Sequence, residues 1–207
     1  MTKIPIIAID IDDVLADSTD VLRIFVNDKH GLELQRHHYQ AKTGVYWGHY
    51  EKIWESHDVD GDGIIDEFHA TYMEDQSHVP SIDGAVDVLK SLHGKFKFIA
   101  ISSRSADMQK ATEKWISKIF YGQIDKVLCI GHGKYAKMSK GETCKRAGAT
   151  YLIDDNIEHC NSAYEFGVVP ILFGDYGWHD HGQKADNFIH CKDWNEVAEY
   201  LHGETAE

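Results

Sequence analysis

Residues 7–15 of the chain read Ile-Ala-Ile-Asp-Ile-Asp-Asp-Val-Leu, and this stretch decides the fold. It continues an apolar, β-branched run that begins at Ile4, the pattern of a strand buried on both faces. The strand ends in three carboxylates, Asp10, Asp12 and Asp13. Residues two apart in a strand share a face, so Asp10 and Asp12 are expected to point the same way. Such carboxylates repel each other unless a shared proton or a cation intervenes, and Mg²⁺ is the hard cation that prefers oxygen ligands.

Three later apolar runs also lead into polar side chains. These are residues 96–101 followed by Ser102-Ser103-Arg104, residues 127–130 followed by Lys137, Lys140 and Lys145, and residues 151–153 followed by Asp154-Asp155-Asn156. Helical patterns lie between the runs, and strands that alternate with helices predict right-handed crossovers and a parallel sheet. Sites in such sheets form at the carboxyl ends of the strands, where all these polar groups fall.

An aspartate pair, a hydroxyl, a lysine and a second aspartate pair, in this order, resemble the motif series of the haloacid dehalogenase-like hydrolases. The details are most similar to the 5′-nucleotidase branch that includes the deoxyribonucleotidases. The resemblance is strong at the four motifs and weak between residues 27 and 79. It implies an α/β fold, a Rossmann-like doubly wound parallel sheet with a small, mainly helical cap inserted after the first strand. Residues 1–26 and 80–207 would form the core, and residues 27–79 the cap.

The resemblance also implies a Mg²⁺-dependent phosphatase of a small phosphorylated metabolite, with a (deoxy)nucleoside monophosphate favoured. Asp10 would be the nucleophile that forms an aspartyl-phosphate, and Asp12 the general acid and base. Asp12 must then begin protonated, and we expect the neighbouring carboxylate to raise its pKa. Asp155 and Asp154 would complete the Mg²⁺ site with Asp10 and the backbone carbonyl of Asp12. Asp13 departs from the Gly or Thr that is common at its position in the wider superfamily, which leaves the substrate open.

Phosphate would be bound by a hydroxyl and a cation. The residues that the resemblance assigns to phosphate are Ser102, Ser103, Arg104 and Lys137. Ser139 followed by Glu142 is a capping-box pattern, so a helix is expected to begin near Lys140, with Lys137 in the loop before it. Lys140 is the alternative to Lys137, because a shift of one turn would exchange the two.

The predicted cap contains two features with alternative interpretations. Its aromatic side chains could stack on a base or form the cap's own core, which is the default for any one of them. Residues 58–66 match the first nine positions of an EF-hand calcium loop, but His69 stands where the loop needs a bidentate Glu. The alternative is an Asp/Gly turn whose carboxylates cap a helix from Ile64. The aromatic residues are Tyr39, Tyr46, Trp47, Tyr50, Trp54, Phe68 and Tyr72.

The totals restrict the classes of partner. The chain has 207 residues and a net charge of −13, which argues against a nucleic-acid polymer as partner but allows a small phosphorylated substrate beside a cation. We expect neither a signal peptide nor a membrane-spanning stretch, and nothing in the sequence indicates an oligomeric state. The four cysteines show no Cys-x-x-Cys spacing, so we expect free, mostly buried thiols in a reducing cytoplasm. The histidines of residues 178–181 are interpreted as ordinary surface residues.

Two other classes compete with a phosphatase. A receiver-like domain also has an acidic pair after its first strand, but it is shorter and places its other functional residues in a different order. A non-catalytic module that keeps the fold is the second alternative, and the complete set of motifs argues against it.

Overall fold

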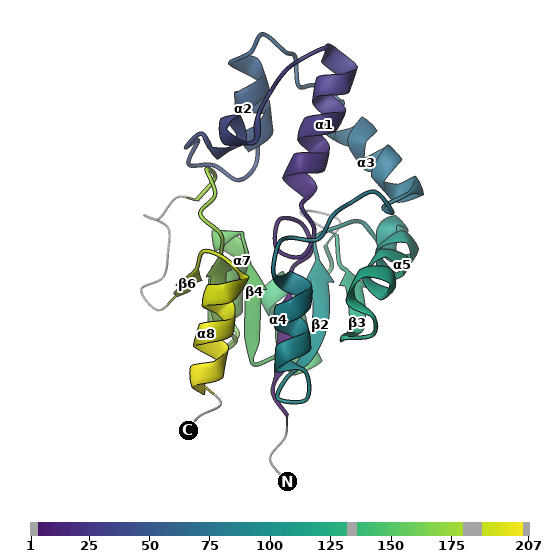
Figure 1. The fold of residues 1–207 in the computed structure, drawn as a ribbon. Helices are drawn as coiled ribbons and strands as arrows, with labels where there is room; N and C mark the ends of the chain where they lie inside the picture. The colour runs from purple at the N-terminus through teal and green to yellow at the C-terminus, as the bar shows by residue number, and fades with distance from the viewer. Residues whose placement is uncertain (1–3, 132–135, 180–187, 205–207) are drawn as a thin grey trace.

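The protein contains a six-stranded, all-parallel sheet with the strand order β3-β2-β1-β4-β5-β6. The computed structural model describes residues 4–131, 136–179 and 188–204, except for the side chains of 72–74. This arrangement confirms the predicted α/β fold with a parallel sheet (Figure 1). The strands are β1 (Ile6–Ile9), β2 (Lys97–Ser102), β3 (Ile124–Cys129), β4 (Tyr151–Asp154), β5 (Val169–Phe173) and β6 (Ile189–Cys191).

The register of the central strands brings the motifs to one edge of the sheet. Ile9 of β1 pairs with Ala100 of β2 and with Ile153 of β4. The Asp10 N–H continues this ladder by donating to the Ile153 carbonyl at 2.9 Å. Since all strands are parallel, Asp10, Ser102 and Asp154 therefore emerge side by side at the carboxyl edge.

Helices cover both faces of the sheet, as in a doubly wound fold. Ile7 and Ile9 face one hydrophobic cluster, which includes buried side chains of α4, α5 and α8. Ala8, on the opposite face because side chains alternate along a strand, belongs to a second cluster with Cys144 and Ala163 of α6 and α7. The helices around the sheet are α4 (Ala85–Leu92), α5 (Gln109–Phe120), α6 (Lys140–Ala147), α7 (Ile157–Glu165) and α8 (Trp194–Glu204), with the short 3₁₀ helix η2 (Ala106–Met108) before α5.

Three α-helices and one 3₁₀ helix form a layer of their own at one end of the sheet (Figure 1). Phe25 packs against Phe68 at a ring distance of 5.6 Å, which joins α1 to α3. The expected end of the first core segment, residue 26, falls inside α1, so a boundary at the start of that helix would keep it whole. The elements of this layer, which we call the cap, are α1 (Ser18–His30), the 3₁₀ helix η1 (Arg36–Gln40), α2 (His49–Glu55) and α3 (Ile64–Glu74).

The acidic loop before α3 does not gather its carboxylates. The Asp62 N–H donates to the Asp60 carboxylate at 3.0 Å, which closes a local turn. Gly63 occupies the N-cap position of α3 and no side chain caps the helix, so the expected carboxylate cap is wrong. Within the described ranges, the only group of acidic, His or Cys side chains close enough to share a cation lies elsewhere, at Asp10, Asp154 and Asp155.

Two other predictions concern the chain as a whole. All four cysteines are free, and Cys144, Cys160 and Cys191 are buried, which confirms the expected thiols. Across the described part of the chain, every helix is too short or too polar to span a membrane.

Candidate active site

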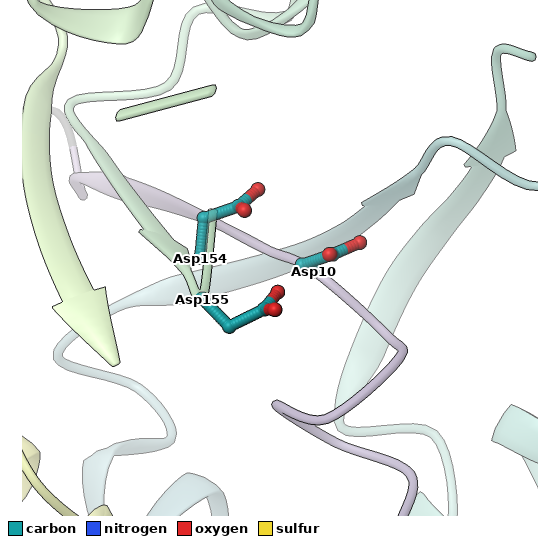
Figure 2. Close-up of side chains that lie close together, drawn as sticks. All are labelled: Asp10, Asp154 and Asp155. Atoms are coloured by element: carbon teal, nitrogen blue, oxygen red, sulfur yellow. The ribbon is translucent and has the colours of Figure 1, made fainter. Parts of the chain in front are cut away.

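Three carboxylates lie together at the carboxyl ends of β1 and β4. Asp10 follows β1, Asp154 ends β4, and Asp155 comes next in the chain (Figure 2). All three are buried, and one oxygen from each lies within 4.8 Å of the others. We call these residues the carboxylate cluster. The structure thus brings together three of the four residues that were predicted to surround a metal.

Lys140 is the cation of this cluster. It is the first residue of α6, and its buried Nζ lies 2.7 Å from Asp154 Oδ2 and 2.9 Å from Asp10 Oδ1, although the latter contact lacks hydrogen-bond geometry. Lys137 is exposed in the preceding loop, so the structure places the alternative, Lys140, beside the carboxylates. The predicted capping box explains the placement: Ser139 Oγ accepts the Glu142 N–H and starts the helix at Lys140.

Close helix packing brings Lys140 to the carboxylates. Gly141 faces α7, and a Cβ atom there would lie 2.2 Å from the Ser162 carbonyl oxygen. Only glycine therefore allows α6 to approach α7 at this distance. Because Lys140 precedes Gly141 in α6, the same close packing buries the Lys140 side chain.

The cluster holds more negative charge than Lys140 can neutralise. Burial raises the pKa of Asp10 to about 6 despite Lys140, and burial together with the neighbouring carboxylates raises the pKa of Asp155 well above its ordinary value. Burial would also raise the pKa of Asp154, but Lys140 and His159 outweigh it and lower that pKa to about 2. Asp155 Oδ1 is buried and makes no hydrogen bond. An unpaired buried oxygen beside two more carboxylates is a donor set that fits Mg²⁺.

Asp12 has a different environment from Asp10. Arg104 donates to both its carboxylate oxygens, from Nη2 at 2.7 Å and from Nε at 2.9 Å, and Ser18 Oγ donates at 2.6 Å. Burial acts to raise the pKa of Asp12, but the Arg104 guanidinium outweighs it, so the pKa lies below its ordinary value. The expectation that Asp12 begins protonated is therefore wrong. It was made without knowledge of the ion pair with Arg104, which spacing in the sequence does not indicate. A third of the Asp12 side chain, 33%, is exposed.

The residues expected to bind phosphate after β2 lie around this ion pair. Ser102 is buried, and its Oγ accepts the Arg104 N–H at 3.2 Å. The Arg104 guanidinium also donates to Gln76 Oε1 at 3.0 Å and to Thr112 Oγ1 at 3.1 Å. Gln76 lies in the segment that follows α3, so Arg104 contacts both the core, through Thr112 and Asp12, and the segment that leaves the cap.

Several side chains at the site were missed by sequence reasoning. His159 lies with Nδ1 3.3 Å from Asp154 Oδ1 and Nε2 3.4 Å from Ser103 Oγ. Its position on the first turn of α7, five residues after Asp154, was the available signal. His179, expected at the surface, is buried with Nε2 2.7 Å from the Asp155 carbonyl oxygen. His181 of the same motif lies outside the described residues.

A cavity of about 240 Å³ lies between the strand ends and the cap. Asp10, Asp12 and Ser102 are among the residues that line it. Its other walls are largely aromatic, and a second cavity of about 230 Å³ shares Tyr46 and Trp47 with the first. We call the cap's aromatic side chains in the first cavity, Tyr46, Trp47, Tyr50 and Phe68, the aromatic wall.

The cap's aromatic side chains thus serve two purposes. Trp54 is fully buried and its Nε1 donates to the Tyr39 hydroxyl at 2.9 Å, so both residues form the cap core, as the default interpretation has it. Trp47 is 55% exposed and lines the cavity instead. The side chain of Tyr72 lies outside the described residues.

Comparison with known proteins places this geometry in a fold family. YfnB from Bacillus subtilis, solved with magnesium, is 11% identical with a TM-score of 0.63. A HAD family hydrolase from Deinococcus radiodurans, with bound phosphate and sodium, is 16% identical with a TM-score of 0.63. A provisionally assigned phosphoglycolate phosphatase from Lactobacillus delbrueckii subsp. bulgaricus is 14% identical with a TM-score of 0.66. Each match covers at least 97% of both chains.

The fold is that of the haloacid dehalogenase-like hydrolases. No protein-family model matches the sequence, and no curated protein is similar to it. At identities this low the likeness concerns the haloacid dehalogenase-like fold alone, and the chemistry has to be argued from the residues.

Proposed function

We propose that this protein is a Mg²⁺-dependent phosphomonoesterase of a small phosphorylated metabolite, with a nucleoside or deoxynucleoside monophosphate favoured. The observation that carries the proposal is the carboxylate cluster with Lys140, buried at the strand ends beneath a cavity. Three carboxylates and one ammonium leave a net charge of −2 when all are ionised, which a divalent cation balances. The Bacillus and Deinococcus structures, with magnesium and phosphate respectively, give independent support.

Asp10 is the nucleophile in this proposal. Lys140 faces its Oδ1, which leaves Oδ2 to attack phosphorus while the bond from phosphorus to the leaving oxygen breaks. Asp10, Asp154 and Asp155 would hold Mg²⁺ together with the Asp12 backbone carbonyl. When bound, Mg²⁺ supplies positive charge that offsets the repulsion between the Asp10 carboxylate and a phosphoryl dianion. Ser102 and Lys140 add donors for the phosphoryl oxygens.

Asp12 transfers the protons in both halves of the reaction. In the first half it protonates the leaving alkoxide, and in the second it takes a proton from the water that attacks the aspartyl-phosphate and releases Asp10. The ion pair with Arg104 keeps Asp12 ionised, which suits the second half. Phosphoryl oxygens compete for the same guanidinium, and loss of the ion pair raises the pKa of Asp12 toward that of a general acid.

The aromatic wall favours a planar leaving group over a small acid. Trp47 and Phe68 line the same cavity as Asp10, and aromatic side chains that stack on a base stabilise the binding of nucleotides. Glu51, an acidic side chain, lines the same cavity and would repel a carboxylate on the substrate. Phosphoglycolate, suggested by the Lactobacillus relative, is therefore the second candidate.

A substrate panel tests the proposal. Phosphate release is measured from p-nitrophenyl phosphate, ribo- and deoxynucleoside monophosphates, sugar phosphates and phosphoglycolate, each with Mg²⁺ and with EDTA. We expect Mg²⁺-dependent release, fastest from a nucleotide. Full activity in EDTA would exclude the metal, and no release from any phosphomonoester would favour a non-catalytic module.

A further inference from the structure

The loop that follows β5, residues 174–179, is built as a rigid element. We call it the aromatic loop; it rises from the sheet to the cap near α2 (Figure 1). The rings of Tyr176 and Trp178 stack with centroids 4.3 Å apart and planes 6° apart. At its base, the Gly174 N–H donates to the Cys191 carbonyl at 2.9 Å, and the Gly174 carbonyl accepts from His190 Nε2 at 2.6 Å. These contacts hold the two rings against each other and join the base of the loop to β6.

One side of the aromatic loop holds the backbone of the site. The Tyr176 hydroxyl donates to the Asp13 carbonyl. Two further donors meet on the Asp155 carbonyl oxygen, His179 Nε2 at 2.7 Å and Trp178 Nε1 at 3.3 Å. Asp155 belongs to the carboxylate cluster, and its Oδ1 is buried without a hydrogen bond. These hydrogen bonds attach the Asp155 peptide to the aromatic loop.

The other side of the aromatic loop binds the cap. The Gly177 carbonyl accepts the N–H groups of Thr43 at 3.0 Å and Gly44 at 3.3 Å. The approach is so close that a Cβ atom at Gly177 would lie 2.2 Å from the Ala41 carbonyl oxygen, although Gly177 has no positive φ that would itself demand glycine. Glycine is needed here for space between the loop and the cap.

The ring of Trp178 extends this contact into the aromatic wall. It meets His49 edge-on at a centroid distance of 5.0 Å and Tyr46 at 6.0 Å. Trp178 is buried and lines both cavities, so one side chain touches the cap, the substrate cavity and the Asp155 carbonyl.

We propose that the aromatic loop couples the seating of the cap to the placement of Asp155, with Gly177 and Trp178 as positioning residues. The two are adjacent in a rigid loop, so a cap that leaves Gly177 also shifts the donors on the Asp155 carbonyl. Hydrogen bonds of this kind, one step removed from a metal, set ligand orientation and metal affinity. The inference rests on the proposed function in assigning Asp155 to Mg²⁺.

The test is Gly177→Ala in the full chain, with Gly203→Ala as the matched control, because a Cβ at Gly203 meets nothing within 4 Å. Amide hydrogen exchange at Thr43 and Gly44 reports cap seating, and calorimetric titration with Mg²⁺, without substrate, reports the site. In Gly177→Ala we expect fast exchange at both amides and Mg²⁺ affinity about tenfold below wild type. Gly203→Ala should match wild type in both measurements.

Trp178→Phe separates the two sides of the loop. It keeps a ring against the cap but removes the N–H that donates to Asp155, so protected amides with weaker Mg²⁺ binding are expected. If Gly177→Ala does not fold, Trp178→Phe decides alone, and an unchanged Mg²⁺ affinity in Trp178→Phe overturns the coupling. For a folded Gly177→Ala protein, two results overturn the coupling. One is fast exchange at Thr43 and Gly44 with wild-type Mg²⁺ affinity, and the other is slow exchange at both amides. A wild-type protein that binds no Mg²⁺ removes the metal assignment itself, and the coupling with it.

Discussion

The strand ends and the cap both line the cavity, and they are built by different means. At the strand ends, backbone pairing places the buried carboxylates of Asp10 and Asp154. At the cap, Trp47 and Tyr46 come from a segment between η1 and α2, and their aromatic rings line the cavity. We therefore expect substitutions at the strand ends to lower activity on every substrate, and substitutions in the cap to change the preference among substrates.

The largest effect is expected at the nucleophile. Asp10→Asn keeps the shape of the side chain but removes the attacking oxygen, so activity on every substrate should fall by at least about 10³-fold. The fold should persist, since the change removes one of three buried like charges. Phosphate release and a thermal melt measure the two quantities. Turnover above about a tenth of wild type in folded protein contradicts the assignment.

The second-largest effect is expected when Lys140 and Lys137 are substituted in turn. Lys140→Met removes the charge that faces Asp10 and Asp154, so kcat/KM on p-nitrophenyl phosphate should fall about 10²-fold. It also leaves buried carboxylates unpaired, which lowers stability by about 3–5 kcal/mol, and excess Mg²⁺ should restore part of it. Lys137→Met, the matched control in the exposed loop, should change neither quantity. Equal losses of activity and stability in the two variants would contradict the assignment of Lys140, and not Lys137, as the lysine of the site.

Asp12→Asn should affect substrates according to their leaving groups. A nucleotide, whose alkoxide needs a proton, should lose about 10²- to 10⁴-fold in rate. p-Nitrophenolate leaves without help, so its first step should suffer less than hydrolysis of the phosphoenzyme, and a burst of p-nitrophenol should precede slow turnover. Rapid mixing with intact-mass detection checks this. Wild-type turnover of p-nitrophenyl phosphate would exclude Asp12 as the general acid and base.

The smallest effect is expected at the cap. Trp47→Ala should lower kcat/KM for the preferred nucleotide about tenfold while leaving p-nitrophenyl phosphate turnover within about twofold, because stacking acts on the base alone. Tyr46→Ala should act in the same direction. Tyr121→Ala is the control, because Tyr121 lies outside the cap at the end of α5 and is 83% exposed. Equal losses on all substrates would place Trp47 in the cap's own packing instead.

The sequence by itself was sufficient for the sheet and for most of the carboxylate cluster. Buried parallel strands are near-continuous apolar runs, and the polar residues that follow them must meet at one edge. Asp10, Asp154 and Asp155 are adjacent to such runs, so their convergence follows from topology alone. Ser139 and Glu142 similarly fixed the start of α6 through a local hydrogen bond.

Only the tertiary structure decided which partner each charged group has. Arg104 is two residues past β2 and nothing local directs it to Asp12, which lies 92 residues earlier in the chain. The position of Lys140 beside the carboxylates depends on the close contact of Gly141 with α7. The burial of His179 depends on the loop in which it lies, because that loop turns back over Asp155. These contacts join segments distant in sequence, and their energies depend on burial and on distances of a few ångströms. Periodicity and spacing carry no information about either quantity.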